Sequence, residues 1–207
     1  MNGRYRLGFA TQRLIGVALI VYATLLSGCG GAPVPEEHFY RLPVGTGPAL
    51  QAPPLPGVLM VQRFTADAVI SQRPMAFAEQ PDVYDLKQYH YHVWADAPPK
   101  LLQEVTVNYL RERGVAGKVT TDSARVLGSY ELAGKINHLE HLRGKVPKVN
   151  VEIEFSLVRL SDNELIWSDT FGRDRPVGDV TVGGAVKAMG QGFETILDQL
   201  VSRIERQ

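Results

Sequence analysis

The only thiol in the chain belongs to Cys29, and its position narrows the chemistry that it can do. A lone cysteine cannot form an intrachain disulfide, a CxxC zinc site or a cysteine-ligated iron–sulfur cluster. Thirteen mostly apolar residues, 14–26, come before it, followed by the small residues Ser27 and Gly28. Because a helix needs about 20 apolar residues to cross a bilayer, this run is too short to span and instead has the length of a signal-peptide core.

The segment Leu26-Ser27-Gly28-Cys29 resembles the lipobox of bacterial lipoproteins, in which the cysteine is acylated and becomes the mature N-terminus. We therefore expect residues 1–28 to be a lipoprotein signal peptide and Cys29 to carry acyl chains, such as palmitate, that anchor the protein. An ordinary secretory signal or a short buried helix is the alternative. Under the sorting rule of Gram-negative lipoproteins, Gly30 after the cysteine favours the outer membrane, with the periplasmic face as the default.

Composition excludes nucleic acid as a partner. The chain has 207 residues with 22 basic and 22 acidic side chains, and residues 29–207 keep 19 basic against all 22 acidic ones. Without a basic field there is nothing to hold a phosphate backbone. A hydrophobic fraction of 44% and a charged fraction of 21% are typical of one globular domain.

No group of residues has the spacing of a catalytic, cofactor or metal site. None of the Gly-Lys pairs completes a phosphate-binding loop, and no Gly-x-Ser-x-Gly elbow occurs. His138 and His141 are three apart, so on a strand they would point to opposite faces. His90 and His92 would share a face with Trp94, but no further ligands are identifiable. We therefore expect a protein that is not an enzyme and holds no cofactor and no metal.

A tyrosine-rich segment is the strongest candidate for an interaction site. The candidate partner-binding residues are Tyr84, Tyr89, Tyr91 and Trp94. Alternation along a strand predicts Tyr89 and Tyr91 on one face and His90, His92 and Trp94 on the other. Two interpretations remain open: a central strand packed on both sides, or an edge whose aromatic residues dock a partner or a second copy.

Prolines, glycines and the period of apolar residues predict the strands and helices that hold these side chains. Residues 29–36 read as a lipidated tether, and the stretch to about residue 56 is rich in Gly and Pro. Strands are predicted at 38–43, 58–64, across 71–94 with a turn near 79–82, at 115–120, and at 165–171. Two longer strands lie between residues 121 and 160, and helices are predicted from Pro98 to Gly114 and over 182–204.

The clearest pattern is the second of the long strands, where apolar residues at 149, 151, 153, 155 and 157 alternate with polar ones. Asp162 and Glu164 beyond it read as turn residues rather than a catalytic pair. The basic stretch His141–Lys148 is predicted to be a hairpin tip, for which a solvated turn is favoured over contact with lipid head groups. Residues 37–207 are thus expected to form one α/β domain, with a mixed, largely antiparallel sheet covered on one face by two helices.

Four motifs in order resemble the ABC-type transport auxiliary lipoprotein family, which includes the paraquat-inducible protein C lipoproteins. They are the lipobox, Phe39-Tyr40-Arg41-Leu42-Pro43, the segment Trp94–Leu102 and Leu165-Ile166-Trp167. The resemblance implies a fold similar to the N-terminal domain of TolB. It also implies a non-enzymatic outer-membrane lipoprotein that works with an MCE-domain protein and ABC transporter subunits to move lipids between the two membranes. The family more often begins this motif with Tyr-Tyr than with Phe39-Tyr40.

Two further roles are weighed beside this one. The aromatic segment would suit a homo-oligomer around the tip of an MCE-domain partner. An assembly lipoprotein that scaffolds an outer-membrane protein or a lipopolysaccharide export complex is the alternative function, and it would bind a β-barrel instead.

Overall fold

A computed structural model describes residues 35–207, so the predicted signal peptide, Cys29 and most of the predicted tether lie outside the described residues. The elements are β1 (His38–Tyr40), β2 (Leu55–Val61), β3 (Thr65–Ala66), β4 (Pro74–Glu79), β5 (Asp82–Trp94), α2 (Pro98–Arg113), β6 (Ala116–Thr121), a 3₁₀ turn (Asp122–Ala124), β7 (Tyr130–Arg143), β8 (Lys148–Arg159), β9 (Glu164–Pro176) and α3 (Val182–Glu205). None of the helices within 35–207 combines the length and apolar character needed to cross a membrane.

The long strand β7 organises the sheet through both of its edges. Along one edge it pairs with β8 in antiparallel register, from Tyr130 opposite Arg159 to Leu142 opposite Lys148. Three parallel strands pair with successive stretches of its other edge: β2 with residues 130–132, β3 with 135–136 and β4 with 140–143. β7 therefore joins segments that are far apart in the chain into one sheet.

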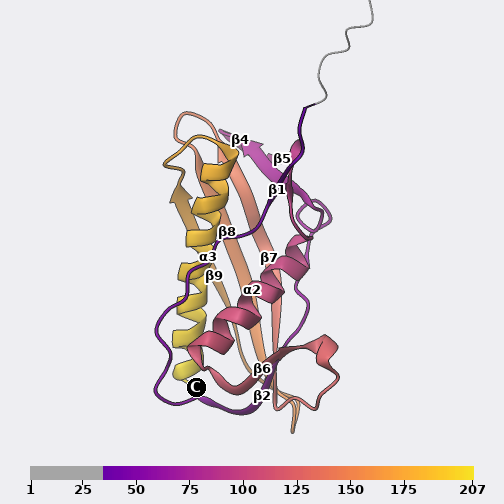
Figure 1. The fold of residues 1–207 in the computed structure, drawn as a ribbon, viewed down its shortest axis with the longest axis vertical. Coiled ribbons are helices and arrows are strands. Elements are labelled where there is room, and N and C mark those ends of the chain that lie inside the picture. Colours follow the sequence, from indigo (N-terminus) through magenta and orange to yellow (C-terminus); the bar gives the residue numbers. More distant parts are fainter. Residues whose placement is uncertain (1–34) are drawn as a thin grey trace, which may run out of the picture. The chain divides into compact units, whose positions relative to one another are not determined.

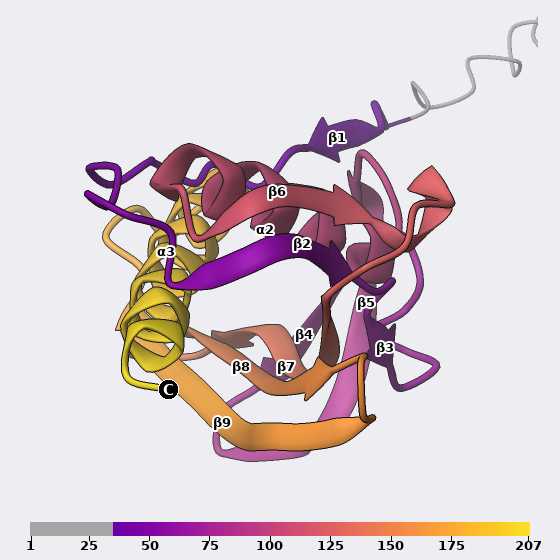
Figure 2. The ribbon, with the colours of Figure 1, turned by 90° about the horizontal axis from the view of Figure 1, so that it is seen from below.

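The predicted fold class is confirmed: the domain is mixed α/β, with a curled sheet and two helices. Antiparallel pairing dominates the long strands β7, β8 and β9 and the β4–β5 hairpin, whereas the pairs that involve β1, β2, β3 and β6 are parallel. Figure 2 shows the curl, with β7, β8 and β9 on one side and β2 and β6 on the other. Figure 1 shows α2 and α3 lying together over one face of the sheet.

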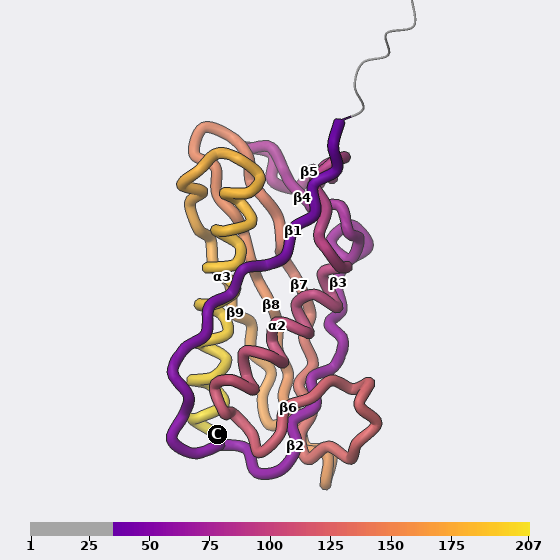
Figure 3. Tube along the Cα trace, in the orientation of Figure 1, coloured from indigo at the N-terminus to yellow at the C-terminus, as the bar shows by residue number. Residues whose placement is uncertain are grey.

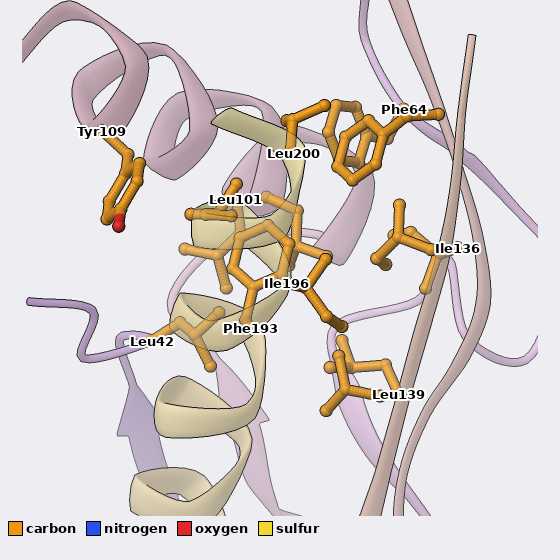
Figure 4. Packing of buried hydrophobic residues seen from close by; sticks show 14 of the residues in the cluster. Leu42, Phe64, Leu101, Tyr109, Ile136, Leu139, Phe193, Ile196 and Leu200 are labelled. Carbon is orange, nitrogen blue, oxygen red and sulfur yellow. The ribbon is translucent and has the colours of Figure 1, made fainter. Parts of the chain in front are cut away.

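Period-two alternation in β8 places its apolar residues in the core, as the sequence predicts. All five of these side chains are fully buried: Val149, Val151, Ile153, Phe155 and Leu157. Side chains of α3 cover this face, and Figure 4 shows Phe193, Ile196 and Leu200 of that helix among residues from α2 and β7. The alternation thus fixes which face of the long strands receives α3.

α2 begins and ends at the predicted signals, and α3, Val182–Glu205, covers the predicted range 182–204. α2 starts with two prolines, whose missing N–H groups would have had no partner there, and Gly114 ends it with a left-handed φ of 70°. The Thr181 hydroxyl accepts a hydrogen bond from Gly184 N at 3.0 Å and so caps α3. The predicted strand 58–64 is shifted: β2 covers Leu55–Val61, and Phe64 lies in the core beyond it.

The segment after β1 lies directly against α3. A Cβ on Gly190 would lie 2.0 Å from the carbonyl oxygen of Pro43, whereas one on Gly192 would lie 3.5 Å from Val151 Cγ2, an ordinary contact. Gly190 is therefore required by close approach of another backbone, and Gly192 is not.

Alanine substitutions at these two glycines of α3 are expected to change the free energy of unfolding in opposite directions. Alanine is better than glycine by about 1 kcal/mol in a helix interior, so Gly192→Ala is expected to leave stability unchanged or raise it by up to that amount. Gly190→Ala is expected to lower the free energy of unfolding by roughly 1–3 kcal/mol, because the methyl group displaces the Pro43 segment. Urea unfolding followed by circular dichroism measures both, and equal stabilisation would contradict the packing of this segment on α3.

Candidate functional site

The four predicted aromatic residues of β5 differ widely in exposure. Tyr84 is 93% exposed and Tyr91 is 43% exposed, while Trp94 is only 1% exposed and belongs to the core. Tyr89 is partly buried and packs against the core. Only Tyr84 and Tyr91 are therefore open to a partner, and the other two hold the strand in place.

The predicted alternation in this segment is wrong, because β5 is irregular. Pro74 of β4 lies opposite Val93, but Ala76 lies opposite Gln88, so two steps along β4 correspond to five along β5. The extra residues bring the ring of Tyr89 to 5.4 Å from the ring of His92, in an edge-on arrangement. Regular alternation would have put these two side chains on opposite faces.

His92 joins β1 to this irregular segment. The parallel pairing of β1 and β5 places His38 opposite His92, and their rings stack at 5.1 Å. The hydroxyl of Tyr40 lies 3.0 Å from His92 Nδ1 and shares a hydrogen bond whose donor depends on the tautomer of the ring. Three aromatic side chains thus bind the first described strand to the rest of the sheet.

Tyr89 continues the cluster to the centre of the sheet. Its hydroxyl lies 2.9 Å from Nδ1 of His141, a residue of β7 that is only 3% exposed. The ring of Phe77 lies 4.4 Å from that of Tyr89, and the guanidinium of Arg143 lies 5.1 Å above Phe77. We call His38, Tyr40, Phe77, Tyr89, His92 and His141 the aromatic–histidine cluster.

Burial favours the uncharged forms of four side chains of the cluster: Tyr40, Tyr89, His92 and His141. Desolvation lowers the pKa of His92, with the nearby His38 as a second cause, and it lowers the pKa of His141, with Arg143 as the second cause. Desolvation likewise raises the pKa of Tyr40 and Tyr89. Neutral rings and hydroxyls are therefore favoured at pH 7, which suits packing and hydrogen bonding rather than proton transfer.

A second polar group, Glu140, was not found by sequence reasoning. It is 3% exposed, its Oε1 lies 2.6 Å from Nδ1 of the exposed His138, and its Oε2 accepts a hydrogen bond from Leu139 N. Burial raises the pKa of the Glu140 carboxyl, and the neighbouring His138 opposes that shift. The only sequence signal was an acid between two histidines in one strand.

The structure brings together no ligand set for a metal. His138 is exposed and His141 is buried, so the two imidazoles diverge as the spacing predicts. Within residues 35–207, no group of three or more histidine, cysteine, aspartate or glutamate side chains is placed to hold an ion. Asp162 and Glu164 both pair with Arg159, at 3.1 and 2.7 Å, in the turn between β8 and β9.

The exposed part of this region is suited to contact with another molecule. Phe39 of β1 is 57% exposed and lies under the guanidinium of Arg73, at 5.5 Å. Phe39 belongs to the edge strand β1 and lies opposite Val93 of β5, which is two residues from the exposed Tyr91. Exposed aromatic rings with a cation nearby are the residue types that anchor protein interfaces.

Comparison with protein families gives one match. Residues 40–201 match the model of a family described as the ABC-type transport auxiliary lipoprotein component. A search among curated proteins returned no match.

Comparison with solved structures supports the fold. A crystal structure of a Xanthomonas campestris protein of the family DUF330 is similar over 79% of this chain and 92% of that one, with 22% identity and a TM-score of 0.69. A second crystal structure, of an uncharacterized protein, covers 82% of this chain and 99% of its own, with 16% identity and a TM-score of 0.64. A PelC dodecamer from Paraburkholderia phytofirmans covers 74% of this chain and 93% of its own, with 17% identity and a TM-score of 0.43, too low to support an argument.

The hydrogen bond between Tyr89 and His141 gives a stability prediction. Nε2 of His141 is buried without a partner among the described residues, so Tyr89→Phe leaves both ring nitrogens unpaired. We expect it to lower the free energy of unfolding by about 1–3 kcal/mol. Tyr84→Phe removes an exposed hydroxyl and is expected to change it by less than about 0.5 kcal/mol. Equal values in urea unfolding would contradict a stabilising role for this bond.

The lowered pKa of His141 gives a pH dependence. As pH falls below about 6.5, the unfolded chain takes up a proton on this ring before the native protein does, so stability falls. The slope of unfolding free energy between pH 7 and about pH 5.5 is expected to be shallower in His141→Gln, although His92 retains part of it. The variant His90→Gln changes an exposed ring and serves as the control. If His141→Gln kept the same slope of unfolding free energy against pH as the unsubstituted protein, the role given to His141 would be contradicted.

Proposed function

The chain belongs to the ABC-type transport auxiliary lipoprotein family, and from this membership we propose its place and its work. The protein is the lipid-anchored outer-membrane component of an ABC/MCE-type system that transports lipids between the inner and outer membranes. The match over residues 40–201 carries this proposal, because it covers most of the domain. The finer features, the MCE-domain partner and the outer membrane, come from the motifs in the sequence.

Anchoring is proposed at Cys29, which lies outside the described residues. The support is its place directly after the apolar run and the small residues Ser27 and Gly28. Two or more acyl chains give stable residence at a membrane, at about 0.8 kcal/mol for each buried CH₂. An anchor confines the domain near its partners and so raises the effective concentration of a modest protein contact.

The work proposed for the domain is binding, without catalysis. The aromatic–histidine cluster supports this, because the hydroxyls of Tyr40 and Tyr89 share hydrogen bonds with His92 and His141 and the rings pack within the sheet. Contact with an MCE-domain protein or another transporter subunit is proposed at the exposed rings of Phe39 and Tyr91. A second copy of this chain could use the same surface in a ring.

A crosslinking experiment in native membranes tests the proposal. A photoreactive side chain at position 91 is expected to capture an MCE-domain protein, and Cys29→Ala is expected to reduce the yield by about tenfold or more, because the effective concentration is lost. Position 165 is the matched control, because Leu165 is similarly exposed, at 57%, near the start of β9. The captured proteins are identified by mass spectrometry.

The other outcomes separate the alternatives. Capture of a β-barrel protein from position 91 would contradict the transport role and favour the scaffolding lipoprotein. Capture of the MCE-domain protein from position 165 alone would keep the function and move the contact away from Phe39 and Tyr91. Crosslinks that do not change in Cys29→Ala would contradict the anchor.

A further inference from the structure

Three loops at one end of the domain each expose an apolar side chain. Tyr84 near the β4–β5 turn is 93% exposed, Val146 in the β7–β8 loop is 69% exposed and Val180 in the β9–α3 loop is 77% exposed. Figure 1 shows these three loops together at its upper end. We call Tyr84, Val146 and Val180 the tip surface.

Hydrogen bonds hold the three loops together. The side-chain amide of Gln80 donates to Val146 O at 3.0 Å and to Leu142 O at 3.1 Å, and its backbone N–H donates to Arg143 O at 2.8 Å. Val177 N donates to Pro147 O at 2.9 Å, which joins the third loop to the second. The tip surface is therefore a fixed arrangement, with little further order to be gained on binding.

Charges of both signs surround the tip surface. Arg143 lies 3.2 Å from Glu79, and Lys148 lies 2.5 Å from Asp174, while Lys145, Asp82 and Asp179 lie near the tip residues in sequence. This mixture gives no strong field of either sign to select an anionic or a cationic partner. The distinctive feature of this end is its projecting apolar groups, and a tyrosine among them is the residue type found where water meets hydrocarbon.

The position and direction of β1 indicate which end of the domain lies nearer to the proposed acyl anchor at Cys29. His38 follows Cys29 by nine residues, which reach at most about 30 Å when fully extended. The chain enters β1 from the same end that carries the three loops (Figure 3). β1 runs parallel to β5, which starts at the β4–β5 turn, so the chain before β1 leads toward the tip surface. This direction, rather than the length of the tether, favours the tip surface over the opposite end as the side next to the bilayer.

We propose that the tip surface faces the membrane that holds the acyl anchor and inserts Tyr84, Val146 and Val180 into its lipid interface. This inference rests on the proposed acylation of Cys29. The domain would then be held in one orientation, with its long strands pointing away from the bilayer and its opposite end presented to the periplasm. Apolar groups that enter the head-group boundary add to anchoring without spanning the membrane.

Depth-dependent quenching in vesicles tests this orientation. In the full-length acylated protein the native cysteine is blocked, so Tyr84→Cys, Val146→Cys and Val180→Cys can each carry one environment-sensitive fluorophore. Leu127→Cys and Leu165→Cys are controls, because both are exposed apolar positions, Leu127 at 97% in the β6–β7 connection and Leu165 at 57% near the start of β9. Vesicles contain phosphatidylethanolamine and phosphatidylglycerol, with a nitroxide on a fraction of the lipid.

Quenching is expected to be at least about twofold greater at the three tip positions than at the two controls. Vesicles of phosphatidylcholine alone are expected to give the same pattern, because the surrounding charges are of both signs and the proposed contact is apolar, and loss of the pattern there would overturn apolar insertion. Equal quenching at all positions, none at any position, or greater quenching at the controls would overturn the proposed orientation. Protein that fails to float with the vesicles would contradict the anchor itself, and the orientation with it.

Discussion

The fold depends on one long strand, β7, which has partner strands along both of its edges. β8 covers one edge of β7, while β2, β3 and β4 divide the other edge among them. Backbone N–H and C=O groups in the core of a sheet must be paired, so β7 is the template on which the short strands find their partners. Because these strands are separated by loops and by α2, the sheet is assembled mainly from non-local contacts, which form slowly during folding.

The irregular end of β5 connects this scaffold to the proposed binding region. An ideal strand would have divided Tyr89 and His92 between the two faces, and the inserted residues bring them together. The resulting chain of contacts leads from His38 on the edge strand to the buried His141 on β7. Polar atoms at the sheet edge are thus satisfied within the protein, and the exposed rings beside them are free for another molecule.

The two proposed contacts use different parts of the domain surface. The edge formed by β1 and the end of β5 exposes Phe39 and Tyr91, and the loops at one end expose the tip surface. With an anchor at Cys29, the first would meet a protein partner while the second rests on lipid. Such a division suits an auxiliary component, because a fixed orientation presents the same edge to every partner that approaches.

Patterns along the chain were enough to predict the α/β class, the places of the two helices, the buried face of β8 and the divergence of His138 and His141. These features are local: prolines, glycines and apolar periodicity act within a few residues. The burial of Trp94, the contact of Tyr89 with His141 and the enclosure of Glu140 beside His138 could be seen only in the folded domain. Those outcomes depend on an irregular strand pairing and on which strands share the edges of β7, and both are set by contacts between residues far apart in the chain.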